Sequence, residues 1–299
     1  MPNKLFEAND FGPGNSDYGR GHPRGLDLKA EIPTTTDGLI GVDLRHVIHV
    51  DEVEAAKGGP GGGGGGGGGG TTFSPYTAGA AGAYNITIQF NGTWTNELHQ
   101  VFVDAANRLT SLITGDLPDV TVRGGKGAPK VVDDILITAE LGNIDGLYGV
   151  LGQAGPTSVR TGSSLPATAQ MQFDIVDVND MGVTVFSDVV LHEMAHSLGF
   201  GSIWDRLGLV SNGSFTGTNA NNEFHALGGT GLIPVEQDGG AGTAGSHWDE
   251  ETFNNELMTG YINDGENYFT AMSAASFKDM GYQIISGYAN WADDGYIFA

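Results

Sequence analysis

The sequence predicts an α+β protein, in which a mixed, twisted sheet packs on two long helices above an irregular lower part. Strand-like and helical patterns alternate along the chain, with strands at 85–90, 131–141 and 169–178 and helices at 95–114 and 184–198. This alternation is typical of a sheet with helices packed against it. Residues 201–255 are rich in Gly, Asn, Thr and Ser and have no period. Such long irregular stretches inside a domain are usually functional.

The individual elements have separate local signals. In 85–90 every second residue is apolar, as in a half-buried strand. Residues 95–114 have apolar side chains at helical spacing, and Thr95 is suited to the N-cap. A last short helix is predicted at 273–280, with Ser273 as its cap.

The charge balance is strongly acidic. The chain has 13 Lys and Arg against 36 Asp and Glu, a net charge of −23. Such a surface repels phosphate backbones, so no nucleic-acid partner is expected. The simplest explanation of the many carboxylates is solubility. The second explanation is weak Ca²⁺ binding, for example at Asp133 with Asp134 or at Asp293 with Asp294.

Cysteine is absent, which excludes disulfides, thiolate metal sites and a cysteine nucleophile. No apolar run reaches about 18 residues, so no membrane-spanning segment is predicted. Residues 1–21 lack the apolar core of a secretory signal. The expected location is extracellular, by a route that needs no such signal.

The chain divides into an N-terminal segment (1–57), a glycine-rich linker or loop (58–70) and a main domain (71–299). Polyglycine has maximal backbone freedom and no side chains to bury. Within the first segment a strand is predicted at 39–50. His46 and His49 would lie there on opposite faces, which makes them poor joint ligands.

The chemistry is carried by H-E-x-x-H, which is His192 to His196 in the second predicted helix. Residues four apart lie one helical turn apart on one face, so both imidazoles can reach one Zn²⁺. Glu193 then stands beside the metal, where it can take a proton from a water on it. Gly199 follows where the chain leaves the helix and needs a positive φ.

A catalytic zinc usually has three protein ligands. Ser202, three residues after Gly199, is a poor one. The sequence leaves four candidates: Asp205, Glu223, His225 and His247. Trp248 and Phe253 favour the last of these, because they can bury its segment and fix the imidazole.

At this point the sequence resembles a known family. LHEMAHSLGFGSIW (191–204) and GGAGTAGSHWDEETFNNELMTGYI (239–262) are similar to the leishmanolysin family of metzincin peptidases, and residues 84–285 resemble its bacterial members. The resemblance implies a metzincin fold, a bound zinc and endopeptidase activity on proteins or peptides. It implies His192, His196 and His247 as ligands, Glu193 as the base and Met258 as the methionine of a turn beneath the metal.

The predicted reaction is peptide-bond hydrolysis by a zinc-activated water. Substrate would lie across the cleft between the two parts, paired with an edge strand such as 169–174. The alternative is a surface or adhesion module in which zinc only stabilises the fold. The intact Glu193 disfavours that alternative, because a structural site needs only the ligands.

Overall fold

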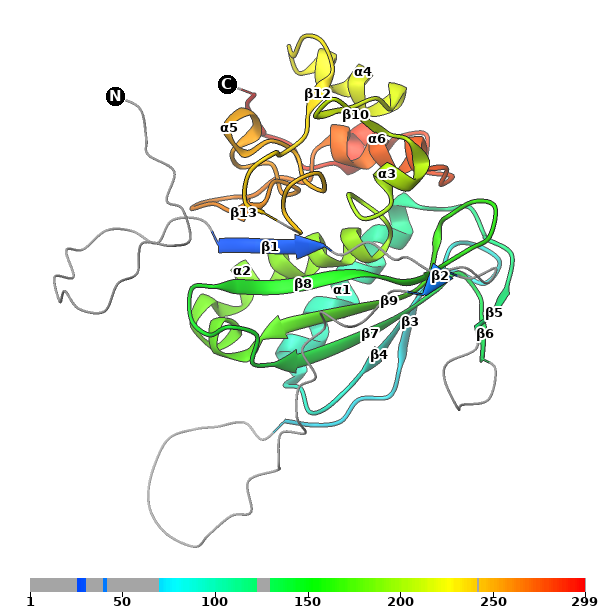
Figure 1. The fold of residues 1–299 in the computed structure, drawn as a ribbon. Helices are drawn as coiled ribbons and strands as arrows, with labels where there is room; N and C mark the ends of the chain where they lie inside the picture. Colours follow the sequence, from blue (N-terminus) through cyan, green and yellow to red (C-terminus); the bar gives the residue numbers. More distant parts are fainter. Residues whose placement is uncertain (1–25, 31–39, 42–69, 123–129, 241, 299) are drawn as a thin grey trace, which may run out of the picture.

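The computed structural model describes residues 26–30, 40–41, 70–122, 130–240 and 242–298, and for the first two ranges only the backbone. These residues form a mixed eight-stranded sheet, two long helices and a second part built of short elements (Figure 1). In chain order the elements are β1 (Leu26–Ala30), β2 (Ile40–Gly41), β3 (Tyr76–Ala78), β4 (Ile86–Phe90), α1 (Asn96–Leu112), β5 (Val120–Val122), β6 (Lys130–Val132), β7 (Ile135–Gly142), β8 (Val150–Val159), β9 (Pro166–Asp174), α2 (Ile175–Ser197), α3 (Trp204–Leu207), β10 (Val210–Ser211), β11 (Ser214–Phe215), α4 (Thr218–Ala226), β12 (Ile233–Pro234), α5 (Glu250–Phe253), β13 (Tyr261–Ile262), α6 (Ala271–Met280) and α7 (Tyr288–Trp291).

The main sheet has the order β13-β1-β8-β9-β7-β4-β3, and β2 also pairs with β8. Strands β4, β7 and β9 run parallel, whereas β8 is antiparallel to β9. The α+β class with a mixed sheet is therefore confirmed. The edge position expected for 169–174 is wrong, because β9 lies between β8 and β7 and is buried along most of its length.

Helices α1 and α2 pack on the same face of the sheet. Thr95 caps α1 as predicted, since its side chain accepts the N–H of Leu98 at 3.1 Å. The ring of Phe102 in α1 lies 5.5 Å from Phe173 in β9 and 6.0 Å from Phe186 in α2. The Phe102 ring therefore contacts both the sheet and the second helix.

Two predicted strands are wrong at one end, and a buried aspartate explains each. The strand expected over 131–141 is split into β6 and β7. Between them Asp134 turns inward, and its carboxylate accepts the N–H groups of Asn85 and Leu117. The strand expected to reach residue 178 stops at Asp174. That side chain caps α2, so residues 175–178 are helical.

The second long helix also begins earlier than predicted, at residue 175 and not at 184. It is interrupted at Gly182, whose φ of 75° and ψ of 165° are not helical. The predicted part, 184–198, is the segment after this break. The region 201–255 is more ordered than expected, because it contains α3, α4 and α5. Helix α6 is capped by Thr270, and not by Ser273.

The N-terminal region contributes two short strands to the sheet. Most of the strand predicted at 39–50 lies outside the described residues, as do His46, His49 and the glycines from 58 to 69. The division into 1–57, 58–70 and 71–299 stays a prediction. Among the helices that the structure describes, none has both the length and the apolarity that a bilayer crossing needs.

We expect a chain that begins at Thr71 to fold. The backbone of Thr71 pairs with Trp94, and the buried apolar side chains of the described region run from Ala78 to Ala292. Strands β3 to β9 with α1 and α2 therefore keep their layer without β1. The measurement is thermal unfolding followed by circular dichroism, with the full chain as control. An unfolded product would make the first segment part of the core.

Candidate metal centre

The last turns of α2 place His192 and His196 on one buried face. Both residues are completely inaccessible, and Val189, Met194 and Leu198 around them in the sequence are buried as well. The helix ends at Ser197, with Leu198 as its C-cap, and Gly199 has the predicted positive φ, 108°. The predicted helical spacing of the two histidines is thus realised.

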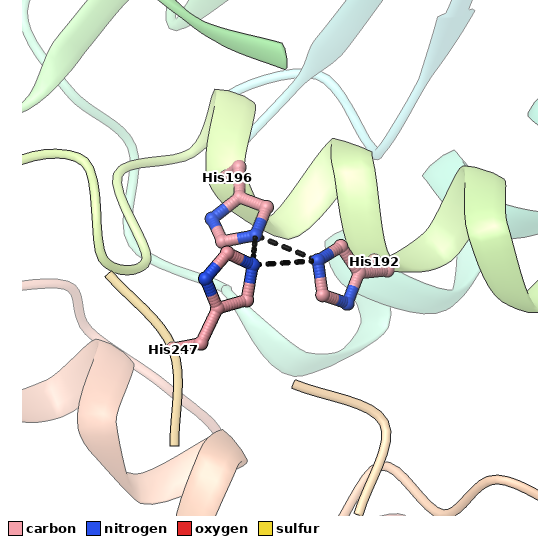
Figure 2. Close-up of side chains that lie close together, drawn as sticks. All are labelled: His192, His196 and His247. Carbon is pink, nitrogen blue, oxygen red and sulfur yellow. Dashed lines mark hydrogen bonds between the residues drawn. The ribbon is translucent and has the colours of Figure 1, made fainter. Parts of the chain in front are cut away.

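The structure brings His247 to the same point from a different part of the chain. Its Nε2 atom lies 3.0 Å from Nε2 of His196 and 3.2 Å from Nε2 of His192, and the latter two are 2.7 Å apart. Figure 2 shows the three Nε2 atoms facing one another. Nitrogen ligands about 2.05 Å from one tetrahedral zinc would lie about 3.3 Å apart, close to this spacing.

The other ring nitrogen of each histidine contacts a backbone carbonyl. The Nδ1 atoms of His192, His196 and His247 lie 2.7, 2.8 and 3.0 Å from the oxygens of Leu257, Phe200 and Thr243. A carbonyl only accepts, so each Nδ1 carries the proton and each Nε2 presents a lone pair. Three lone pairs directed at one buried point are a donor set that suits a metal cation. The residues therefore fit a metal ion.

Electrostatics keep these rings neutral, as metal binding requires. Burial lowers the pKa of His247 to about 4. Burial also lowers the pKa of His192 and of His196 well below its usual range. For both, the nearby imidazoles lower it further, and the backbone carbonyl contact opposes the shift.

The segment that carries His247 is held on both sides. Its backbone carbonyl accepts the N–H of Glu236, and Trp248 donates its N–H to the carbonyl of Met258. The Trp248 ring is fully buried, stacked 4.7 Å from Trp204, and Phe253 is buried beside it. The burial of this segment by Trp248 and Phe253 is as the sequence predicted.

A glycine allows the loop after α2 to approach this segment. At Gly201, φ is 66° and a Cβ atom would lie 1.9 Å from the carbonyl oxygen of Ser246. No other residue fits there without moving one of the two loops. The side chain of the neighbouring Ser202 does not face the three Nε2 atoms, because its hydroxyl donates to the carbonyl of His196.

Glu193 is also fully buried. It packs against Gly152 of β8, where an added Cβ would come within 3.1 Å of its Cγ and Oε1 atoms. It follows His192 directly in α2, and its side chain contacts β8 at Gly152.

Met258 lies in a buried turn organised by Glu256, which the sequence analysis did not single out. One carboxylate oxygen of Glu256 accepts the N–H of Met258 at 2.6 Å. The other accepts the N–H and hydroxyl of Thr270 and the hydroxyl of Ser273. The turn therefore fixes the carbonyl of Leu257, on which His192 is oriented. The sequence held one signal for this turn, an acidic residue two positions before Met258.

The rival third ligands lie elsewhere. Asp205 is exposed in α3, and Glu223 in α4 accepts the hydroxyl of Tyr288. His225 is exposed at the end of α4, with Nε2 2.7 Å from the carbonyl of Gly231. Of the four candidates, the structure brings only His247 together with His192 and His196.

Calcium has no support at the carboxylate pairs named above. Both oxygens of Asp134 already accept backbone N–H groups, and Asp293 forms an ion pair with Arg108 at 2.7 Å. Asp116, Asp133 and Asp134 do lie close together. Acidic groups gathered at a surface are common without an ion, so this cluster does not support the expected Ca²⁺ site.

We expect Glu256 to make stability depend on pH. Burial raises the pKa of Glu256 from 4.5 to about 7, although four hydrogen bonds to its carboxylate oppose the shift. Between those two values the unfolded chain ionises first, so the contribution of Glu256 to the free energy of unfolding falls as pH rises from 5 to 7. The three buried histidines contribute in the opposite sense, because their pKa values are lowered. In Glu256→Gln only the falling contribution should disappear, so the free energy of unfolding should rise more steeply with pH than in the wild type. The measurement is urea unfolding of metal-free protein at pH 5, 6 and 7.

The matched control for Glu256 is Asp279→Asn. Asp279 in α6 also accepts backbone N–H groups, those of Asn219 and Ala220, but it holds α4 and not the turn at Met258. This variant should keep the pH slope of the wild type. An unchanged slope in Glu256→Gln would show that the carboxyl group keeps one protonation state over this range.

Comparison with known proteins finds a similarity that covers the same region. Residues 149–291 match the family model of leishmanolysin. A leishmanolysin homolog of Crithidia fasciculata is 28% identical over 152 residues, which cover 45% of this chain and 22% of that protein. Leishmanolysin of Leishmania donovani is 30% identical over 132 residues, covering 39% and 22%, and that of Leishmania major gives the same values.

The matched region spans about a fifth of the length of these relatives. It nevertheless includes every residue of the centre just described, from Gly152 in β8 through the three histidines to Glu256. The resemblance to leishmanolysin seen in the sequence is thereby confirmed over this region, and the bacterial grouping stays a prediction. Over residues 149–291, this chain is leishmanolysin-like.

Proposed function

We propose that this protein is a zinc-dependent metalloendopeptidase that hydrolyses peptide bonds in proteins. The proposal rests on one observation. The Nε2 atoms of three buried, neutral imidazoles lie within 3.2 Å of one another, and Glu193 follows His192 on the same helix. The leishmanolysin-like region around these residues supports the same reading. We assign the ion to His192, His196 and His247.

When bound, zinc supplies two things: a lowered pKa for a coordinated water, to about 7, and polarisation of the scissile carbonyl. The chain supplies orientation. The three backbone carbonyls at Nδ1 hold the rings, and this outer contact typically affects metal affinity 10- to 100-fold. Burial of all three rings keeps bulk water away from the centre.

Glu193 is the proposed general base. It takes a proton from the attacking water and passes it to the leaving amine, so no covalent intermediate is needed. Contact with Gly152 fixes its side chain relative to β8. We further propose a metzincin arrangement, in which Met258 and its turn form the floor beneath the metal and α2 forms the wall above it.

Casein zymography, with and without a chelator, tests the activity itself. Clearing that disappears with chelator and returns with zinc is expected. Zinc bound by the three histidines without any clearing would favour the alternative, a zinc-stabilised surface or adhesion module.

We expect Glu193→Gln to keep zinc and lose nearly all turnover. The amide has the shape of the carboxylate but cannot accept a proton at neutral pH, and general-base catalysis typically contributes 10²- to 10⁴-fold. The measurements are zinc content by atomic absorption and the rate of peptide cleavage. Wild-type turnover in the zinc-loaded variant would remove Glu193 from its role.

The ligand assignment predicts a contrast between two histidine variants. His247→Ala should weaken zinc binding by orders of magnitude, because two protein ligands remain. His225→Ala should leave it unchanged, since His225 is exposed at the end of α4. Competition with a chelator of known affinity measures both. The opposite result would transfer the third ligand to His225 and refute the centre drawn in Figure 2.

A further inference from the structure

A cavity of about 300 Å³ lies where the end of α5 meets the last residues of the chain. In Figure 1 this region lies around α5. The cavity is separate from the metal centre, since no histidine is among the described residues that line it. Phe253 lines it on the inner side, and the ring of Phe253 lies 6.5 Å from that of Trp248. Its volume is at the lower end of the range of small-ligand sites.

Two tyrosine rings and a carboxylate form part of the cavity wall. The ring centroids of Tyr268 and Tyr296 are 5.9 Å apart, with the planes inclined by 62°. Tyr296 is fixed because its hydroxyl donates to the carbonyl of Phe253 at 2.8 Å. The hydroxyl of Tyr268 donates to Glu266 at 3.2 Å. Glu266 is exposed, and a carboxylate accepts several hydrogen bonds, so it can also accept from a ligand.

The charge around the cavity favours a cation. None of the described residues that line it is a lysine or an arginine. Burial raises the pKa of Tyr296, and the negative charges of Glu256 and Glu250 raise it further. The faces of the tyrosine rings also carry negative potential. An anionic ligand would be repelled here, whereas an organic cation would meet both aromatic rings and a carboxylate.

The same region already binds one guanidinium in this way. The Cζ atom of Arg108 lies 5.0 Å from the ring of Trp291 and 5.9 Å from that of Phe269, and Arg108 pairs with Asp293 at 2.7 Å. Those two rings are 5.4 Å apart, which is close to the spacing of the two tyrosines. Phe269 directly follows Tyr268, and Asp293 lies three residues before the second tyrosine. Two neighbouring segments therefore build two sets of paired rings with a carboxylate, and Arg108 occupies one of them.

We propose that the cavity between α5 and the C-terminal residues binds a guanidinium group, the side chain of an arginine presented by another protein. A planar guanidinium stacks on aromatic rings and also forms paired hydrogen bonds with a carboxylate. An ammonium group uses the charge but has no planar fork, so lysine fits the site less well. This binding site is separate from the metal centre and does not depend on the proposed peptidase function.

The test uses three small probes and the full chain. N-acetyl-arginine amide carries the guanidinium, N-acetyl-lysine amide carries only the charge, and N-acetyl-citrulline amide keeps the shape of arginine without its charge. Backbone amide NMR shifts of Asn254, Asn255 and Gly295, which line the cavity, report binding directly. The arginine probe should shift these three amides with a dissociation constant in the millimolar range. The lysine probe should bind more weakly, and the citrulline probe should leave the shifts unchanged.

Three variants locate the site. Glu266→Gln and Tyr268→Leu should each weaken binding of the arginine probe about 2- to 5-fold, because single contacts of this kind are modest at an accessible site. Glu251→Gln is the matched control. Glu251 is exposed on α5 and does not line the cavity, so this variant makes the same charge change beside the site and should bind like the wild type. Circular dichroism verifies that each variant is folded.

Four results would overturn the proposal. Shifts that are absent at all three amides with the arginine probe would show that the cavity is not a binding site. Equal binding of the citrulline probe would show that charge is not recognised, and equal binding of the lysine probe would refute the guanidinium assignment. Equal weakening by Glu251→Gln and Glu266→Gln would show a general attraction to the acidic surface in place of a defined site.

Discussion

Three buried imidazole nitrogens face one another and cannot donate hydrogen bonds to each other, since the proton of each ring is already used at Nδ1 on a backbone carbonyl. The surrounding structure is arranged around this constraint. Helix α2 supplies two of the rings, and the carbonyls that orient them come from other segments: Leu257 in the turn and Phe200 after the helix. The centre is therefore assembled from backbone positions as much as from side chains.

The second part of the molecule is what makes those positions rigid. Its short helices and strands enclose an aromatic cluster in which Trp204, Phe215 and Trp248 lie within about 5 Å of one another. The indole N–H of Trp248 donates to Ser273, and the hydroxyl of Ser273 donates to Glu256. A continuous set of contacts thus leads from the residue after His247 to the turn that orients His192.

Local signals were enough for much of the fold and for part of the site. The N-cap at Thr95 and the positive φ at Gly199 depend on neighbours in sequence, and so does the spacing of His192 and His196. The split at Asp134 and the early start of α2 at Asp174 were missed, because those carboxylates are satisfied by N–H groups from distant loops. The interior place of β9 and the pairing of β1 also depend on long-range strand order. The choice of His247 over His225 came from its apolar neighbours Trp248 and Phe253 and from the family resemblance, since ligand chemistry alone does not separate two histidines.

The distance along the chain between the metal-facing histidines has a consequence for the polymer as a whole. His196 and His247 are 51 residues apart. An ion held by both would close a loop of that length, as a disulfide does, and closing such a loop removes about 4 kcal/mol of chain entropy from the unfolded state. In a chain without cysteine this would be a covalent-like cross-link of the fold. The loop it closes contains α3, α4 and the short strands between them. Its sequence is rich in Gly, Asn, Thr and Ser, and its helices and strands are short.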